Sequence, residues 1–194
     1  MIELLTADTP NGKKISIMLE EIKFDYKVTK VNLYKDEQFK PEFKKLSPFK
    51  KIPVIIDHDE NLSLFESGAI LMYLGEKSEM FYNKDERTTI NQWLMGQMAY
   101  IGPMLGQHHQ FHHYNPGKSK FGENRYFKIA SQIYKDLDER LSESKYLAGK
   151  NYTIADIATF PWIARHEWHD IGLKKFKSLT RWYEEISRRK AVQD

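Results

Sequence analysis

Residues 51–71 combine a proline-marked strand with the start of a helix, and both features have a use in binding. The residue before a proline favours extended geometry, so Ile52 should present its backbone N–H and C=O as the edge of a strand does. Pro53 cannot donate a backbone hydrogen bond and belongs at the start or edge of a strand. Ser67 and Gly68 open an apolar helical repeat, whose free N–H groups attract a carboxylate. Together these features favour a short peptide ligand with a free carboxylate.

The loop Thr9-Pro10-Asn11-Gly12 supplies a hydroxyl and an amide just before the first predicted helix. These two donors suit a thiolate, because hydrogen bonding to the charged form of a thiol lowers its pKa. The same four residues also have the composition of a plain turn and helix N-cap. Turn chemistry on its own favours this second interpretation, and the residues alone leave both open.

Charged side chains add further candidates, and each has an ordinary alternative. Glu66 could accept an ammonium group while Ser67 donates to a carboxylate, although a plain N-cap explains Ser67 equally well. Lys51 could meet a second carboxylate or simply extend into solvent. Arg125 could hold a carboxylate through two parallel hydrogen bonds. Its spacing is also that of an exposed arginine near the start of a helix.

Four histidines crowd residues 108–113, with pairs four residues apart on one helical face. Histidines at this spacing can bind zinc. No cysteine or carboxylate stands at ligand spacing beside them, so we expect no metal site. We expect His108, His109, His112 and His113 to line the entrance of a cleft or a bend of a helix near Gly106.

The first third of the chain is predicted to fold as strand, helix, strand, connector, strand, strand and helix. Hydrophobic runs and alternation place strands at residues 2–5, 26–33, 54–56 and 62–64, and helical periodicity places helices at residues 15–22 and 69–77. Parallel strands joined by a crossover helix and completed by a hairpin form a thioredoxin-like unit.

The remainder is predicted to be helical, with helices at residues 85–113, 121–142, 153–168 and 176–189. Thr153 and Asp156 form a capping box at the start of a helix that is apolar nearly all round, so this helix should be central to the helical part. We predict an α+β protein with a thioredoxin-like domain at 1–77, a linker at 78–86 and an all-helical domain at 87–194.

Composition narrows the classes of function. The 194 residues are 41% hydrophobic and 29% charged, and 30 basic against 27 acidic residues give a net charge of only +3, which argues against a nucleic-acid binder. The chain contains no cysteine, which excludes disulfides, a protein thiol nucleophile and cysteine-ligated metals. No apolar run approaches the roughly 20 residues of a membrane span, and no secretory signal is recognisable. We expect a cytoplasmic protein that binds neither nucleic acid nor membrane.

Several of these motifs, in this order, resemble the nu class of bacterial glutathione transferases. Members of that class act as disulfide-bond reductases and are relatives of the yeast prion-forming nitrogen regulator. The resemblance covers nearly the whole chain. It is carried by Thr9-Pro10-Asn11-Gly12, Gln38 within QFKPEF, Ile52-Pro53, Glu66-Ser67, GPMLGQ at residues 102–107 and Arg125-Tyr126. It implies a homodimer that uses glutathione as cosubstrate, with a substrate cleft between the two domains.

The resemblance also implies how glutathione would be held. Thr9 and Asn11 would bind its thiolate, with the threonine in the place where other classes use tyrosine, serine or cysteine. Ile52 would pair with the cysteinyl backbone as an added strand does, and in the family the bond before this proline, Pro53 here, is cis.

Further contacts are implied for the two ends of the peptide. Lys51 would meet the glycine carboxylate, while Glu66 and Ser67 would hold the γ-glutamyl end. Gln38 is carried over from the family pattern. Arg125, from the helical domain, would hold a second glutathione unit.

The activity implied by the resemblance is glutathione-dependent reduction of disulfides, with weaker transferase or peroxidase activity. Because the chain has no cysteine, the glutathione thiolate itself would attack the disulfide. Two alternatives stay open: a conventional transferase that conjugates glutathione to electrophiles, and a catalytically silent glutathione-binding regulator on the same fold.

Overall fold

The computed structural model describes residues 1–193. The N-terminal elements are β1 (Ile2–Thr6), α1 (Pro10–Ile22), β2 (Tyr26–Lys30), two short 3₁₀ turns, η1 (Leu33–Lys35) and η2 (Glu37–Phe39), then α2 (Pro41–Leu46), β3 (Val54–Asp57), β4 (Leu62–Phe65) and α3 (Ser67–Ser78). The C-terminal elements are α4 (Arg87–Gly96), η3 (Gln97–Ile101), α5 (Gly102–His108), η4 (His109–Tyr114), α6 (Lys120–Glu143), α7 (Ile154–Ile163), α8 (Lys177–Ser187) and α9 (Lys190–Gln193).

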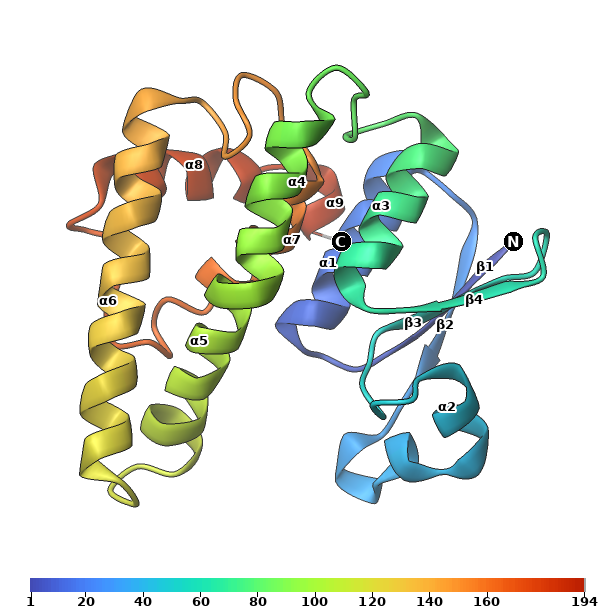
Figure 1. Cartoon of the computed structure of the whole chain (residues 1–194), viewed down its shortest axis with the longest axis horizontal. Coiled ribbons are helices and arrows are strands. Elements are labelled where there is room, and N and C mark those ends of the chain that lie inside the picture. Colours follow the sequence, from blue (N-terminus) through green and yellow to red (C-terminus); the bar gives the residue numbers. More distant parts are fainter. Residues whose placement is uncertain (194) are drawn as a thin grey trace.

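A four-stranded mixed sheet in the order β2-β1-β3-β4 organises the N-terminal half (Figure 1). β1 runs parallel to β2 and antiparallel to β3, which pairs with β4 as a hairpin. Successive residues of a strand face opposite sides of a sheet. Leu4 accordingly packs into the large cluster under α1 and α3, whereas Leu5 packs with Phe43 of α2 on the other face. This is the thioredoxin-like arrangement that the sequence predicts.

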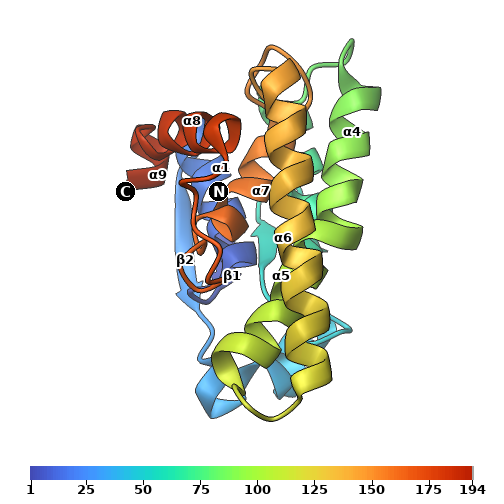
Figure 2. The same ribbon diagram turned by 90° about the vertical axis from the view of Figure 1, so that its left-hand side faces the viewer.

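The described C-terminal half, residues 87–193, consists of helices and connecting turns. Every residue of α7 is buried, as its all-round apolar sequence predicts, and the helix lies between α1 and the layer of α4 and α6 (Figure 2). The predicted capping box is confirmed: Thr153 accepts a hydrogen bond from the first turn, and Asp156 accepts one from the backbone N–H of Thr153.

One hydrophobic cluster runs from β1, α1 and α3 into α4 to α8, so the two halves share a core. Helix α3 ends at Ser78 and α4 begins at Arg87. The division of the chain into domains at 1–77 and 87–194 stays a prediction.

The predicted strand over residues 26–33 is too long. β2 ends at Lys30, because the Asn32 side chain accepts hydrogen bonds from the backbone of Tyr34 and Lys35 and starts a 3₁₀ turn. An asparagine that bonds to the backbone two and three residues ahead competes with strand pairing.

The long helix predicted at residues 85–113 continues through Gly102 and Pro103, two residue types that often end a helix. The preceding turn, η3, has the wider π-helical spacing, and Pro103 sits at the start of α5. Such a bulge accommodates the missing N–H of proline without ending the helix.

The helix predicted at residues 153–168 ends earlier, at Ile163. The following turns bring His169 into the interior, where its Nδ1 lies 2.7 Å from the Tyr134 hydroxyl. Helical periodicity from residue 153 does not reveal this, because the contact is made with a distant part of the chain.

Candidate active site

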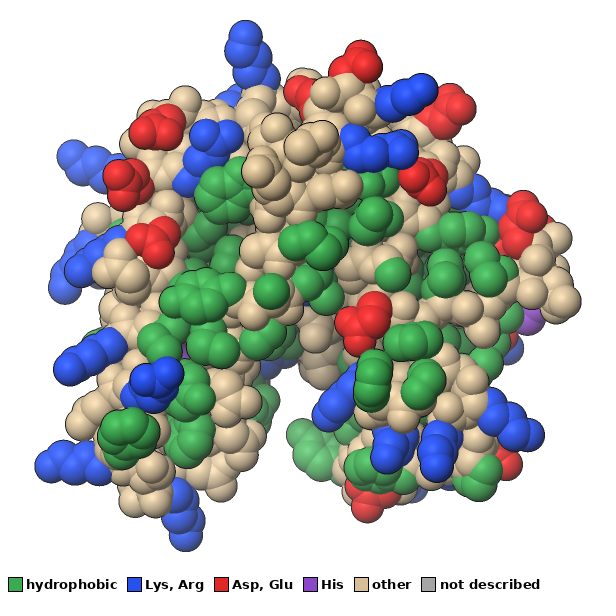
Figure 3. Space-filling view, in the orientation of Figure 1, with side chains coloured by type: hydrophobic (Ala, Val, Ile, Leu, Met, Phe, Trp, Pro, Cys, Tyr) green, Lys and Arg blue, Asp and Glu red, His purple; other side chains and the backbone are tan. Residues whose placement is uncertain are grey.

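A cleft of about 340 Å³ opens between the two halves of the molecule. Its lining includes Asn11 and Lys14 from α1 and Glu66 from the residue before α3. The opposite wall comes from η3, α5 and α7, through Gln97, Met98, Gly102, Pro103, Gly106, Gln107 and Trp162. Figure 3 shows the broad notch between the lower end of the helical half and the part that carries α2. Two of the predicted site residues, Asn11 and Glu66, therefore face this cleft.

Thr9 is the N-cap of α1, and its Oγ1 accepts a hydrogen bond of 3.1 Å from the backbone N–H of Gly12. A side chain at Gly12 would come within about 2.5 Å of the Ala7 carbonyl oxygen, so glycine is required for this close turn. Thr9 therefore acts as the N-cap of α1, as the second interpretation predicts. Its hydroxyl hydrogen is still free to donate to a ligand.

Asn11 is oriented from the other half of the chain. The indole N–H of Trp162 in α7 donates to Asn11 Oδ1 at 3.2 Å. Because the amide oxygen is occupied, the NH₂ group of Asn11 is left to donate. The sequence pattern did not single out Trp162, since a tryptophan in a fully apolar helix is ordinarily core.

Ser67 is almost fully buried at the first position of α3, where the side chain of Lys14 reaches it. Lys14 Nζ lies 3.2 Å from Ser67 Oγ and 2.7 Å from Gln97 Oε1. Burial lowers the pKa of Lys14 to about 7, while the nearby Glu66 carboxylate raises it. The sequence did contain a signal for Lys14, because it stands four residues before the buried Met18, on the apolar face of α1.

The side chains of Thr9, Asn11 and Ser67 share one pattern of hydrogen bonding. In each, the side-chain oxygen already accepts a hydrogen bond, from Gly12, Trp162 and Lys14 respectively. Each group therefore has a hydrogen left for a partner that is an acceptor. Anions such as a thiolate or a carboxylate are the acceptors that bind such donors most strongly.

The peptide bond between Ile52 and Pro53 is cis, and β3 begins directly after it. Ser47 Oγ occupies both the N–H and the C=O of Lys51, at 3.1 and 2.9 Å. Among residues 1–193, the backbone of Ile52 has no hydrogen-bond partner in the protein. The backbone of Ile52 is thus free to pair with a ligand just before the central strand β3, and the Lys51 side chain beside it is exposed. Its role in binding stays a prediction.

Glu66 has a backbone φ of +72°, in a region that non-glycine residues rarely adopt. The following residue begins α3. Residues held in such conformations cost of order 1–3 kcal/mol and concentrate at binding sites. The strain places an exposed carboxylate at the mouth of α3, next to the cleft.

The remaining two predicted site residues, Gln38 and Arg125, are not among the residues that line the cleft. Gln38 lies in η2, and its Oε1 is buried without a partner among the described residues. Arg125 is exposed on the second turn of α6, with its guanidinium 6.0 Å from the Tyr126 ring centre.

His108 and His109 pack inside the helical half rather than along the cleft entrance, whereas His112 is half-buried and His113 is exposed. His108 and His109 are buried; His108 Nε2 lies 2.9 Å from the carbonyl oxygen of His169, and the His109 ring stacks on His169 and Trp162. For His108 and His109 the prediction of a cleft entrance was wrong, and the alternative of a helix bend is supported by the π-helical turn of η4. For His112 and His113 the cleft entrance stays a prediction. Stacking between rings that are distant in the sequence leaves no pattern in the local sequence from which it could be predicted.

Acid should destabilise the protein through this cluster. Burial lowers the pKa of His109 to about 4 and that of His169 to about 2, and also lowers the pKa of His108. The pKa of a histidine in the unfolded chain is about 6.5. The stabilisation of the fold by these neutral histidines is therefore present above pH 6.5 and is lost as the pH falls towards 4. Each histidine that stays neutral on folding contributes a slope of about 1.4 kcal/mol per pH unit in that window.

Urea unfolding at pH 5, 6 and 7 tests this expectation with His109→Phe, which keeps a stacking ring. Nε2 of His109 has no partner among the described residues, so the replacement costs no hydrogen bond there. The variant should lose stability less steeply than the wild type between pH 6 and 5. Equal slopes for the two proteins would rule out His109 as a titrating group.

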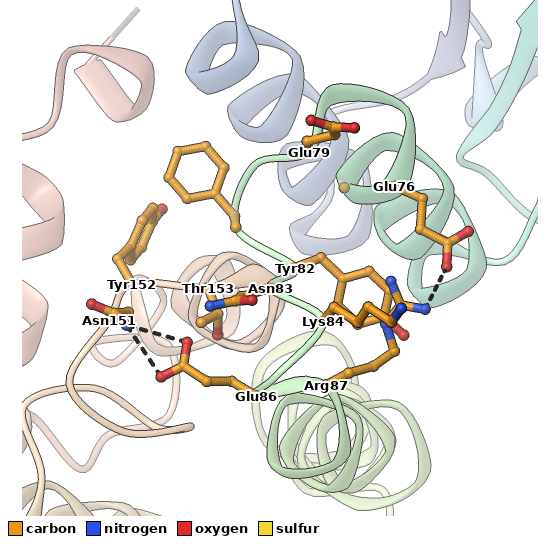
Figure 4. Close-up of a pocket in the computed structure, with 12 residues that line it drawn as sticks. Glu76, Glu79, Tyr82, Asn83, Lys84, Glu86, Arg87, Asn151, Tyr152 and Thr153 are labelled. Atoms are coloured by element: carbon orange, nitrogen blue, oxygen red, sulfur yellow. Dashed lines mark hydrogen bonds and ion pairs between the residues drawn. The ribbon is translucent and has the colours of Figure 1, made fainter.

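A second cavity, of about 700 Å³, lies where the segment between α3 and α4 meets Asn151 and Tyr152 (Figure 4). It is larger than the cleft, but several of its polar groups already bind one another. Arg87 pairs with Glu76 at 3.2 Å, and Glu86 accepts hydrogen bonds from Asn151. A ligand site needs polar groups that converge on a ligand, so we place the site in the cleft.

Residues 1–193 contain no helix that is both long and apolar enough to cross a membrane. Over the same residues, no three histidine, cysteine, aspartate or glutamate side chains are grouped as metal ligands would be.

The sequence matches two family models, "Glutathione S-transferase, N-terminal domain" over residues 3–76 and "Glutathione S-transferase, C-terminal domain" over residues 123–190. The chain therefore belongs to the glutathione S-transferase family, with the family's thioredoxin-like and helical halves.

Individual relatives agree with this assignment. The chain is 45% identical to the disulfide-bond oxidoreductase YfcG of Escherichia coli K12, with 99% of this chain and 93% of the relative covered. A glutathione transferase from Pseudomonas putida, crystallised with one glutathione disulfide per subunit, superposes with a TM-score of 0.93 at 40% identity, covering 99% and 89%. A glutathione transferase from Burkholderia graminis, crystallised with two glutathione molecules per subunit, superposes with a TM-score of 0.94 at 36% identity, with 99% of this chain and 85% of the relative covered.

Proposed function

We propose that this protein reduces disulfides with glutathione as the thiol donor and no cysteine of its own. The observation that carries the proposal is the set of three hydrogen-bond donors described above, Thr9, Asn11 and Ser67, each oriented by a bond to its oxygen. Asn11 lines the cleft, Ser67 directly follows the lining residue Glu66, and Thr9 stands two residues before Asn11. The protein itself has no thiol. Such a site can hold a thiol ligand as its thiolate, which is the nucleophile in thiol–disulfide exchange.

In this proposal each part of glutathione has its own partners. Thr9 and Asn11 donate to the sulfur, and the unpaired backbone of Ile52 pairs with the cysteinyl residue as an added strand. Ser67 and the N-terminus of α3 bind the γ-glutamyl carboxylate, and Glu66 accepts its ammonium. Lys51 meets the glycine carboxylate, Pro53 follows the paired Ile52 just before β3, and Gln38 supplies its side-chain amide.

The chemistry needs two glutathione molecules for each disulfide. The first thiolate attacks one sulfur of the substrate; a new S–S bond forms, the old one breaks, and the second sulfur leaves as a thiolate that takes up a proton. A second glutathione thiolate then attacks the glutathione sulfur of the mixed disulfide and releases the other substrate thiol. The products are oxidised glutathione and two thiols, and the protein is never covalently modified.

The relatives support this choice over the alternatives. One of them is named a disulfide-bond oxidoreductase, and solved relatives hold a glutathione disulfide or two glutathione molecules per subunit. A conventional transferase needs room for one glutathione and an electrophile, and a silent regulator needs no second thiol.

Binding of oxidised glutathione distinguishes the disulfide reductase from the conventional transferase and the silent regulator. We expect one molecule per chain in isothermal titration calorimetry. Arg125→Ala should weaken this binding roughly 10-fold, because a charge-assisted hydrogen bond to a carboxylate contributes about 1.5–3 kcal/mol. Lys128→Ala, one turn later on the same exposed helix, is the matched control and should bind as the wild type does. Equal binding by both variants would remove Arg125 from the site.

We also propose that the protein is a cytoplasmic homodimer of the nu class. Hydrophobic side chains gather on the face that carries α4, α3 and β4 (Figure 3), and Leu62, Met95 and Tyr100 are exposed. A second copy packed on this face would cover them. Sedimentation equilibrium at micromolar concentration would measure the mass directly.

A further inference from the structure

Lys14 is a buried cation that orients Ser67 but has no contact with glutathione in the proposed chemistry. Its side chain is only 1% exposed, and Asp57 and Asp156 are the only other ionisable carboxylate or lysine side chains described as buried. Unlike Asp57, which pairs with Lys77, Lys14 forms no ion pair within 4 Å in the described part of the chain. Burying a lysine without a partner is costly, since it disfavours the charged form. Packing alone therefore does not explain a lysine at this position.

The contacts of Lys14 join both halves of the molecule at the cleft. From α1, its Nζ reaches Ser67 Oγ of α3 at 3.2 Å, and it reaches Gln97 Oε1 at 2.7 Å and Met98 Sδ at 3.5 Å in η3. An ammonium group has three hydrogens and no acceptor. All three can thus be used within the protein, and none of them is left for a ligand.

The bond from Lys14 decides what Ser67 can do. Because Ser67 Oγ accepts from the ammonium, its own hydrogen must point elsewhere, and in the structure it faces Met98 Sδ at 3.7 Å. A thioether is a weak acceptor. A carboxylate arriving at the start of α3 is a much stronger one, so it would take this hydrogen and also add a negative charge close to Lys14.

The surroundings of Lys14 allow the negative charge of a bound carboxylate to change its protonation. The ionised group that acts on it is Glu66, just before α3; η3 contributes an amide and a thioether, and Trp162 of α7 contributes an indole that is bonded to Asn11. Burial lowers the pKa of Lys14 to about 7, so the free protein carries the proton only part of the time near neutral pH.

We propose that Lys14 is a positioning residue whose ammonium directs the Ser67 hydroxyl hydrogen to the ligand carboxylate, and that the bound carboxylate in turn favours the charged form of Lys14. The inference rests on the glutathione binding proposed above. Its consequence is that binding takes up a proton from solution, and that affinity falls as the pH rises above 7.

Calorimetry with S-methylglutathione tests the inference, because this ligand has no thiol to release a proton. Titrations at pH 8 in buffers of different ionisation enthalpy give the number of protons taken up. The wild type should take up about half a proton or more per ligand, and this number should shrink towards zero at pH 6, where Lys14 is already charged. A proton number that does not change between pH 6 and 8 would overturn the inference without any variant.

Lys14→Met provides the second arm, with Lys13→Met as the matched control on the exposed side of α1. Methionine fills the space of the lysine stem without a charge, while Ser67 Oγ and Gln97 Oε1 lose their donor. Lys14→Met should take up at least half a proton less than Lys13→Met at pH 8 and should bind S-methylglutathione about 10-fold or more weakly.

The outcomes separate the two proposals. If the wild type does not bind S-methylglutathione, the proposed function itself fails. If it binds, and Lys14→Met takes up as many protons as the wild type, only the role of Lys14 fails.

Discussion

Replacing Thr9 by alanine is expected to lower kcat/KM for glutathione-dependent disulfide reduction about 10- to 100-fold. The lost bond is one from a hydroxyl to a thiolate, and hydrogen bonds to charged groups contribute roughly 1.5–3 kcal/mol, where about 1.4 kcal/mol is tenfold in rate. Thr9→Ser keeps both the cap and the donor and should retain most activity. The measurement is steady-state turnover as a function of glutathione concentration.

Thr9 also caps α1, so the variant will lose stability, and this loss must be separated from the chemistry. Ser119 offers a matched control, because its Oγ accepts from Gly122 N at 3.1 Å, as Thr9 Oγ1 accepts from Gly12 N at the same distance. Ser119→Ala and Thr9→Ala should each lose about 1 kcal/mol of stability. Only Thr9→Ala should lose turnover; a similar loss in both would reduce Thr9 to a structural residue.

Asp156→Ala is expected to lower the free energy of unfolding by about 3–5 kcal/mol. The carboxylate is fully buried and accepts four hydrogen bonds, from Leu147 N, from Thr153 N and Oγ1, and from Trp182 Nε1. Alanine leaves these donors without their acceptor and opens space between α7 and α8. Urea unfolding followed by circular dichroism would measure the change, and the melting temperature should fall by about 10 °C or more.

Asp136→Ala is the control for this prediction. Asp136 is exposed on α6 and accepts a single hydrogen bond from Gln132, four residues earlier. Its loss should change stability by no more than about 0.5 kcal/mol. If Asp156→Ala were as mild as Asp136→Ala, the capping box would not be the anchor between α7, α8 and the preceding loop that the geometry indicates.

The fold follows from local patterns to a large extent. Alternation and helical periodicity predicted the sheet and the helices, and the Thr153/Asp156 box predicted the start of α7. The predicted ends of two elements were wrong, because a local hydrogen bond or a contact with a distant residue outweighed the sequence pattern. Asn32 ended β2 early, and burial of His169 against Tyr134 ended α7 early.

The candidate site was predictable only in part, for a related reason. Single motifs indicated Thr9, Asn11, Ile52 and Ser67, because turns, prolines and helix starts have local signatures. What orients these groups comes from far along the chain: Trp162 is 151 residues from Asn11, and Gln97 is 83 residues from Lys14. Only the three-dimensional structure brings such pairs together.

The most direct test of the central claim is the glutathione-dependent reduction of bis-hydroxyethyl disulfide, coupled to NADPH oxidation by glutathione reductase. The proposed site predicts robust turnover by the cysteine-free wild type, saturable in glutathione and strongly reduced in Thr9→Ala. Glutathione binding without any turnover would contradict the reductase function and leave electrophile conjugation or a binding role in its place.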